Sequence, residues 1–533
     1  MLDPSPVSYD QVPYPSLSYV QSHPDRLATL ATLLGQSPKP IERCRVLELG
    51  CASGGNLIPM AYGLPESEFL GLDISPRQIA DAQKVAAGVG LKNITFECRD
   101  ILGVSPDLGK FDYVIAHGVY SWVGPEIQDK VLQICKQNLA ADGVAYISYN
   151  TYPGWHMMNI IRDAMLYHTR DAANPQTRAV QSRALLDFLV GSVSTDNLAY
   201  GSFLQAYANF LRGEIERMEE RGNAYLLHDE LEATNTPVYF HEFMARAAAQ
   251  GLQYLIEADP ASVFPGNMAP QVQQTLRQMA RDVLDMEQYV DFVCNRMFRQ
   301  TLLCHDDATV ERGLTPERLK GLYIASRALP VSDDPAIDTD AVEQFRSPNG
   351  ATLSIDHPVS KAAMVYLGQM WPQAVLFDDL LAIARKRVAA EDDQNAARDA
   401  AALAVNLMKG FGYSTQLVEL HTHAPSLAKE AGERLLVSRV AIFQARSGLE
   451  VTNLWHERVP LNAFVRHLLC RLDGTKDRKA LLDELGDMVA EGRLTVKQDE
   501  QPVKGPEVVR DILARDLEQH LGWLARAALL VAD

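Results

Sequence analysis

Short apolar runs separated by amphipathic segments dominate the first 150 residues of the chain. The runs lie near residues 46–49, 69–74, 93–101, 111–118 and 144–149, and segments with helical spacing of apolar residues lie between them, for example at 57–62, 76–88 and 125–139. Buried parallel strands are nearly continuous apolar runs because helices cover both faces of their sheet. The alternation therefore predicts an α/β fold with a doubly wound, Rossmann-like sheet.

A glycine-rich turn follows the first apolar run. Residues 45–56 are Arg-Val-Leu-Glu-Leu-Gly-Cys-Ala-Ser-Gly-Gly-Asn. Gly50 and Gly54 permit backbone angles that other residues avoid, and they let a ligand approach the main chain. Three residues separate them and no Gly-Lys-Ser/Thr follows, so the turn is neither a dinucleotide fingerprint nor a phosphate loop. Ligands bind at the carboxyl ends of parallel strands, so we expect a binding site here.

Two further apolar runs also end in an acidic residue. Asp73 lies about twenty residues after the glycine turn, where a carboxylate accepts hydrogen bonds from ribose hydroxyls. The other interpretation is that Asp73 caps the next helix, a role that Ser75 also fits. Asp100 is placed to accept from an adenine amino group, with Ile101 against the ring. Past the fourth and fifth runs, aromatic and polar residues gather at 118–123 and 150–156, and such loops favour a binding site over simple core packing.

Beyond residue 160 the apolar period becomes mainly helical. We predict four parts: a ligand-binding domain with an N-terminal arm at 1–160, a helical regulatory or dimerisation domain at 161–330, a linker at 331–350, and an accessory region at 351–533. The accessory region has the helix, helix, helix, strand order of a winged-helix unit, with a looser repeat near the C-terminus. One of its helices begins with the acids 391–393, which repel phosphate and favour protein contact over DNA binding.

Composition narrows the possible functions. A net charge of −18 argues against a general nucleic-acid binder. The seven cysteines form no CxxC pair, and no second histidine completes His-Glu-x-x-His, so we expect no metal site. No stretch of 18 apolar residues and no basic leader occur, so we expect a cytoplasmic protein without membrane insertion.

Three segments together resemble bacterial class I S-adenosylmethionine (AdoMet) methyltransferases that carry a methyltransferase regulatory domain: 48–56, 116–123 and 149–155. Segments 237–243, 251–255 and 298–305 are similar to that second domain, and the resemblance covers nearly the whole chain. It extends to rickettsial protein-lysine methyltransferases of outer-membrane proteins. The resemblance implies AdoMet as the methyl donor, lysine Nε as the acceptor, a homodimer, and an accessory region that recruits unfolded or extended protein.

The resemblance and the strand ends assign roles to individual residues. The expected cofactor-binding residues are Glu48, Gly50, Cys51, Ala52, Ser53, Gly54, Asn56, Asp73, Ile74, Asp100, Ile101 and His117. The expected catalytic residues form an aromatic acceptor channel and a proton acceptor: Tyr9, Tyr14, Tyr120, Trp122, Tyr152, Trp155 and His117, with His156 or solvent as other proton acceptors. Two other functions stay open at this point, a small-molecule N- or O-methyltransferase and a non-catalytic AdoMet-binding regulator.

Overall fold

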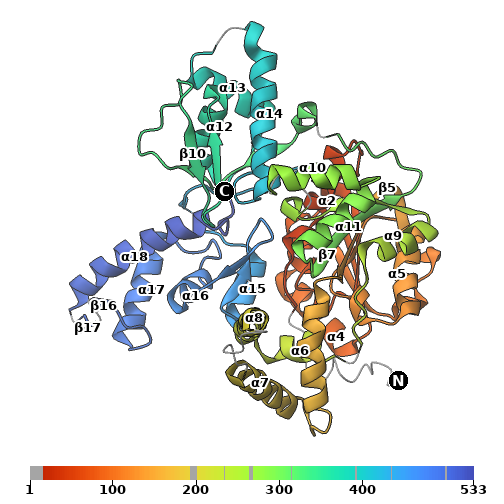
Figure 1. Ribbon diagram of the computed structural model, residues 1–533. Coiled ribbons are helices and arrows are strands. Elements are labelled where there is room, and N and C mark those ends of the chain that lie inside the picture. Colours follow the sequence, from red (N-terminus) through yellow and green to blue (C-terminus); the bar gives the residue numbers. More distant parts are fainter. Residues whose placement is uncertain are drawn as a thin grey trace.

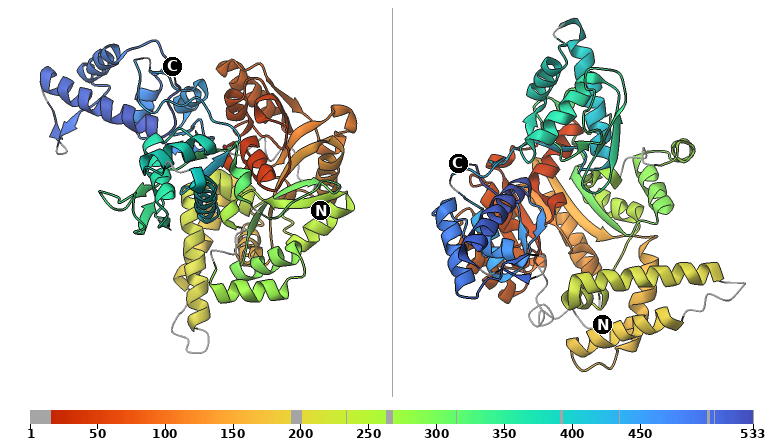
Figure 2. Two further views of the ribbon diagram at one scale, coloured as in Figure 1. Left: turned by 90° about the horizontal axis from the view of Figure 1, so that it is seen from above. Right: turned by 90° about the vertical axis from the view of Figure 1, so that its left-hand side faces the viewer.

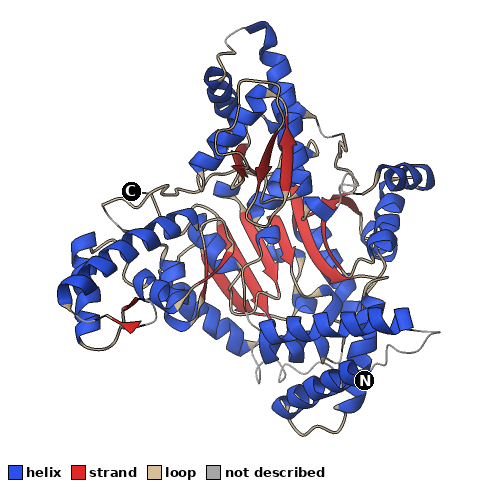
Figure 3. Cartoon of the chain, turned by 60° about the vertical axis from the view of Figure 1, so that its left-hand side comes forward, coloured by secondary structure: helices blue, strands red, loops and turns tan. Residues whose placement is uncertain are grey.

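The computed structural model describes residues 16–192, 201–232, 234–262, 268–313, 315–390, 393–433, 435–498, 501–503 and 505–532. Tyr9 and Tyr14 lie outside the described residues. A seven-stranded sheet with helices on both faces forms the centre of the chain (Figure 3). Its strands are β1 (Arg45–Leu49), β2 (Glu68–Asp73), β3 (Ile94–Cys98), β4 (Phe111–Ala116), β5 (Leu139–Asn150), β6 (Leu252–Glu257) and β7 (Phe298–His305).

The strand order in this sheet is β3-β2-β1-β4-β5-β7-β6. The first five strands are parallel, and β7 runs antiparallel to both of its neighbours. The flanking helices are α2 (Pro24–Leu33), α3 (Leu57–Gly63), α4 (Pro76–Val89), α5 (Pro125–Asn138) and α9 (Phe240–Ala249). Apolar side chains from both sheet faces are buried beneath these helices, as the continuous apolar runs predict.

The predicted domain boundary at residue 160 is wrong for the sheet. Strands β6 and β7 come from the segment 161–330, which we expected to be a separate helical domain, and they complete the sheet beside β5. Their apolar residues, such as Leu252 and Leu303, belong to the same core as Leu47 of β1. The isolated β-like runs of that segment therefore belong to the ligand-binding fold.

Between β5 and β6 the chain forms a helical arm. Helices α6 (Trp155–His168), α7 (Pro175–Ser192) and α8 (Gly201–Tyr225) pack around their own apolar cluster, which includes Ile161, Met165 and Leu211. The arm projects from the sheet at the bottom of Figure 1 and of the right-hand view in Figure 2. Helices α10 (Pro270–Met279) and α11 (Val283–Cys294) lie between β6 and β7 in sequence.

The next part of the chain is a small α/β unit, and it includes most of the predicted linker. Its elements are β8 (Tyr323–Ala325), β9 (Leu329–Pro330), β10 (Glu343–Arg346), β11 (Thr352–Ile355), α12 (Pro358–Met370), β12 (Val375–Leu376), α13 (Phe377–Arg387), α14 (Ala396–Tyr413) and β13 (Glu419–His421). Strand β10 pairs with β9 and β11, and the buried Lys361 ammonium donates to the carbonyls of Ala336, Thr339 and Ala341 at 2.7–2.8 Å. The segment 331–350 is therefore a folded part of this unit.

The C-terminal unit has a core of its own, with Val465, Leu481 and Leu513 at its centre. Its elements are α15 (Arg439–Ser447), β14 (Glu450–Thr452), β15 (Arg458–Pro460), α16 (Ala463–Leu469), α17 (Arg478–Ala490), β16 (Lys497–Gln498), β17 (Gln501–Pro502) and α18 (Pro506–Arg526). Helix α15 packs on α3 and α4, with the Phe443 ring over Gly88. The unit thus lies against the sheet domain beside the glycine turn. Among the described residues no helix is both long and apolar enough to cross a bilayer.

Candidate functional site

The glycine turn after β1 has the backbone conformation that its sequence predicts. Gly50 and Gly54 adopt φ angles of +71° and +77°, in the left-handed region that favours glycine. Both positions are also crowded, since a Cβ on Gly50 would lie 2.5 Å from Val119 and one on Gly54 would lie 2.7 Å from Phe96. The turn is therefore fixed by backbone angle and by close packing, and its main chain can contact a ligand.

Asp73, at the end of β2, anchors the turn. Its carboxylate accepts hydrogen bonds from the backbone N–H groups of Ala52 and Ser75, both at 2.9 Å. Ser75, and not Asp73, caps helix α4, because the Ser75 hydroxyl accepts from the N–H of Gln78. The Asp73 carboxylate therefore fixes the backbone of the glycine turn against the end of β2.

Apolar side chains are exposed next to Asp73. Ile74 is 45% exposed and Leu102 is 41% exposed, so both aliphatic side chains are open to a ligand. Ile101 is half-buried close by in sequence, and the exposed Asp100 accepts from the N–H of Leu102 at 2.9 Å. An apolar surface with carboxylates beside it fits a nucleoside, with the base on the aliphatic side chains.

Glu48 supplies a buried acceptor at the end of β1. Its side chain is 3% exposed, and Oε1 accepts a hydrogen bond from Asn56 Nδ2 at 2.7 Å. Its Oε2 has no partner among the described residues. Burial raises the pKa of Glu48 to about 7, with a further contribution from the Asp73 charge and an opposing one from the Asn56 hydrogen bond. An unpaired buried carboxylate oxygen of this kind suits a cationic ligand group such as an amino-acid ammonium.

His117 follows β4 and is held by aromatic neighbours. Its Nδ1 lies 2.8 Å from the hydroxyl of Tyr146, and Tyr19 stacks on the imidazole at 3.6 Å between ring centroids. Burial lowers the pKa of His117 to about 3, so the ring is neutral at physiological pH. A group with so low a pKa holds a proton poorly, which argues against His117 as the proton acceptor.

The predicted aromatic channel is only partly assembled. Trp122 and Trp155 lie edge to face at 6.4 Å, and Tyr152 stacks on His156 at 4.0 Å. Tyr120 does not join them: it is fully buried in the core, where it packs against Phe243 at 5.2 Å. The 3₁₀ turn Tyr120–Trp122 explains the difference, because it leaves Tyr120 buried and Trp122 partly exposed.

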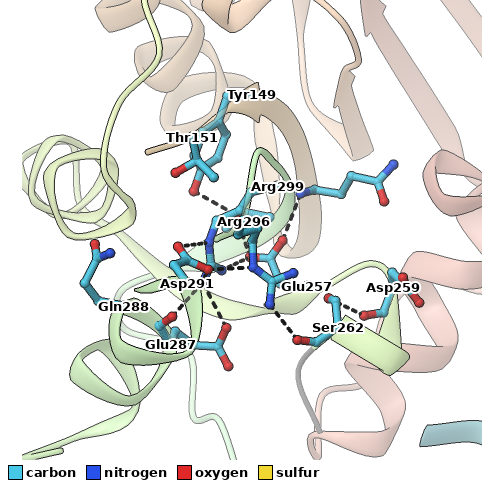
Figure 4. A network of polar contacts seen from close by, with 12 residues as sticks. Tyr149, Thr151, Glu257, Asp259, Ser262, Glu287, Gln288, Asp291, Arg296 and Arg299 are labelled. Atoms are coloured by element: carbon cyan, nitrogen blue, oxygen red, sulfur yellow. Dashed lines mark hydrogen bonds and ion pairs between the residues drawn. The ribbon is translucent and has the colours of Figure 1, made fainter. Parts of the chain in front are cut away.

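Figure 4 shows a buried ionic network around Arg299 and Arg296. Arg299, on β7, is fully buried and contacts the carboxylates of Glu257, Glu287 and Asp291 at 2.6–3.1 Å. Its neighbours along the chain hold the loop: the carbonyl of Met297 accepts from Thr151 N–H, and that of Arg296 accepts from Gly154 N–H. The loop at the carboxyl end of β5 is thus fixed to the residues that lead into β7.

Several residues that contact the site are remote from the glycine turn in the chain, and none of them was among the residues expected from the sequence. The Ser16 hydroxyl accepts from Gly55 N–H at 2.6 Å, Tyr19 covers His117, and His456 of the C-terminal unit lies 2.9 Å from Asn56. No local spacing marks them, since their roles depend on tertiary packing. Among the described residues no group of three or more His, Cys, Asp or Glu side chains is placed to hold a metal ion.

The sheet order, the glycine turn and the three strand-end carboxylates define a class I methyltransferase that uses AdoMet. Three family descriptions match the chain: "Methyltransferase domain" at 41–187, "Predicted methyltransferase regulatory domain" at 222–305, and "PKMT, C-terminal winged helix domain" at 433–529. The last match covers the second of the two winged-helix-like units that the sequence predicts.

Similar proteins match over the whole length. The uncharacterized protein RP789 of Rickettsia prowazekii is 36% identical over 530 residues, which are 98% of this chain and 93% of RP789. The structure of PKMT2 from Rickettsia typhi in complex with AdoHcy aligns with a TM-score of 0.86 and 27% identity, covering 98% of this chain and all of PKMT2. The chain belongs to this family of bacterial AdoMet-dependent methyltransferases with a regulatory domain and a winged-helix C-terminal unit.

Proposed function

We propose that this protein transfers methyl groups from AdoMet to the Nε atoms of lysine residues in protein substrates. The observation that carries the proposal is the extent of the similarity to PKMT2, a name that abbreviates protein lysine methyltransferase. It includes the C-terminal unit as well as the sheet domain. A small-molecule methyltransferase needs only the AdoMet fold and a closed pocket, so accessory units of this size favour a macromolecular acceptor.

The cofactor site follows from the strand ends described above. AdoMet supplies a methyl group activated by its sulfonium. We assign the methionine part to Glu48 and the backbone of residues 50–54, the ribose to Asp73, and the adenine to Ile74, Asp100 and Ile101. Glu48 Oε2 has no hydrogen-bond partner among the described residues, Asp73 holds the turn at the end of β2, and Ile74 is exposed where a base can stack.

The acceptor approaches from the side of Trp122, Tyr152 and Trp155 in this proposal. Aromatic faces attract ammonium and sulfonium groups by about 0.5–2 kcal/mol each. Lysine must lose a proton before it attacks, because its reference pKa is about 10.4. A water-poor aromatic surface disfavours the charged form and so promotes this loss. The low pKa of His117 leaves solvent or the exposed His156 to receive the proton.

The substrate class that we propose is an extended, lysine-containing protein segment, with outer-membrane proteins before they fold as the first candidates. The working protein is a cytoplasmic homodimer in this proposal, and light scattering of the purified protein tests the dimer directly.

The charge of the protein does not favour nucleic acid as the substrate, since the net charge is −18.

The test uses purified protein, tritiated AdoMet and heat-denatured lysate of the native host, separated on a gel. We expect labelled protein bands whose methylated residues are lysines by mass spectrometry. The Asp73→Ala variant serves as the control without cofactor binding and should give no band. Label confined to the small-molecule fraction would refute protein methylation and point to a small-molecule acceptor. AdoMet binding without any transfer would point to a regulator.

A further inference from the structure

One side chain of the C-terminal unit reaches the cofactor turn. His456 is 4% exposed, and its Nε2 lies 2.9 Å from Oδ1 of Asn56, 400 residues earlier in the chain. Asn56 follows the glycine turn and donates through Nδ2 to Oε1 of Glu48 at 2.7 Å. A continuous set of hydrogen bonds therefore connects the C-terminal unit to the carboxylate that we assign to the AdoMet ammonium.

The direction of these hydrogen bonds is fixed by their partners. The backbone N–H of Tyr19 lies 3.0 Å from Oδ1 of Asn56, and a backbone N–H can only donate. Oδ1 is therefore the acceptor, so Nδ2 faces Glu48 and also donates to the Ser22 hydroxyl at 3.0 Å. His456 must then carry its proton on Nε2. Burial lowers the pKa of His456 well below its usual range, which keeps the ring neutral with a single N–H.

The loop around His456 is anchored on both sides. Asn453 Oδ1 accepts from the N–H groups of Trp455 and Glu457, and this turn holds His456 at a φ angle of +64°. Trp455 stacks on His421 of the preceding unit at 4.1 Å, and its indole N–H donates to the carbonyl of Pro372. The imidazole position is thus set by the packing of the C-terminal unit on its neighbours.

We propose that His456 is a positioning residue for AdoMet: through Asn56 it orients the Glu48 carboxylate, and so couples the C-terminal unit to cofactor binding. A movement of this unit, for example on binding a protein segment, changes AdoMet affinity. Thermodynamic linkage then requires that AdoMet changes the affinity for that segment by the same factor.

A matched pair of variants tests this role. His456→Asn tolerates the positive φ, because asparagine is favoured there, but its amide is too short to reach Asn56. His456→Gln places an amide N–H at about the position of Nε2 and should restore the contact. The exposed His467, also in the C-terminal unit, provides the control variant His467→Asn.

AdoMet affinity is measured by calorimetry from pH 5.5 to 8.5, with thermal denaturation as a check of folding. We expect His456→Asn to weaken AdoMet binding about fivefold, the effect of one lost buried hydrogen bond, while His456→Gln stays within about twofold of wild type. The fall in AdoMet affinity at low pH reports protonation of Glu48, and we call this part of the profile the acidic limb. The groups that face Glu48 are Asp73, Cys51 and Asn56, and His23 lies next to His456. This limb should move to higher pH by about half a unit in the Asn variant, because a looser Asn56 stabilises the carboxylate less.

Wild-type affinity in the Asn variant would overturn the proposal. Equal weakening in the Asn and Gln variants, without a shift of the acidic limb, would show that His456 only packs. If the Asn variant does not fold, ¹⁵N-histidine NMR of the wild-type protein determines which ring nitrogen of His456 carries the proton. The His456 signal is assigned as the one that is missing in the Gln variant. The Nε2–H tautomer is required, and an Nδ1–H tautomer would exclude the donation to Asn56.

Discussion

Replacing Arg299 by methionine tests whether the buried ionic network holds the sheet domain together. The guanidinium contacts Glu257 at 2.6 Å, Asp291 at 2.8 Å and Glu287 at 3.1 Å, and it lies 3.8 Å from the Phe240 ring centroid. Methionine keeps the apolar contact and removes the charge. The three carboxylates are each at most 5% exposed, and among the described residues the ion pair left to them is the one between the partly buried Arg296 and Asp291.

The size of the effect follows from the burial of these carboxylates. Removing one partner of a buried ion pair costs about 3–5 kcal/mol, because the remaining charge is left unpaired in a poorly solvated site. For a domain of this size that corresponds to a fall in Tm of about 6–20 °C. Burial already raises the pKa of Glu287 to about 7 in the wild type, against the lowering effect of Arg299. Loss of Arg299 raises the pKa of this carboxyl further.

The assay is urea unfolding followed by circular dichroism at pH 8 and pH 5. Burial raises the pKa values of Glu287 and Asp291 above their usual values, and loss of the Arg299 charge raises them further. The penalty is therefore full at high pH and disappears as pH falls and these two carboxylates take up protons. We expect a loss near 4 kcal/mol at pH 8 and a clearly smaller loss at pH 5. Arg296→Met is the control and should cost less, because Arg296 pairs with one carboxylate, Asp291. A loss below about 1 kcal/mol, or one independent of pH, would refute the reasoning.

Three further predictions concern the cofactor, the acceptor and the junction between units. Asp73→Ala should abolish AdoMet binding in calorimetry, and unchanged affinity would exclude Asp73 as the ribose ligand. Trp155→Ala should leave the AdoMet dissociation constant unchanged and lower turnover on protein substrate about tenfold or more, as one lost cation–π contact near 2 kcal/mol requires, and equal turnover would remove Trp155 from the channel. Burial lowers the pKa of His421, but the carboxylates of Asp25 and Glu419 outweigh this effect and raise the pKa to about 9. Protonated His421 therefore contributes about 3 kcal/mol to the free energy of unfolding, and this contribution is full below pH 6.5 and lost as pH rises through 9. Urea unfolding of His421→Gln and wild type should differ at pH 6 and converge near pH 10, and a constant difference would contradict the ion pair.

The parts of the site that the sequence predicts are those set by local spacing. Gly50, Gly54 and Asp73 lie where a strand ends, and their backbone angles and hydrogen bonds follow from that position. Tyr120 differs, because the spacing of a loop does not tell which of its aromatic residues turn into the core. Tyr19 and His456 reach the site through packing between distant segments, which no single-sequence pattern reports.

The domain boundary illustrates the same limit. The apolar runs of β6 and β7 are visible in the sequence, but β5, the strand that joins them to the sheet by pairing with β7, lies about 150 residues before β7, beyond the helical arm. Periodicity identifies a strand and does not identify its neighbour. The folded state of the predicted linker also depends on a remote residue, the buried ammonium of Lys361.

The contact between Asn56 and His456 has a consequence for biosynthesis. The two residues are 400 positions apart, so at about 5–20 residues per second the ribosome needs about 20–80 s to make the second after the first. A chain that ends before β7 can hold the glycine turn and its strand-end acids, but it lacks both the strand that completes the sheet and the imidazole that contacts Asn56, and a chain that ends between β7 and His456 still lacks the imidazole. Completion of the methyl-donor site thus reports that almost the entire polypeptide has been translated and assembled.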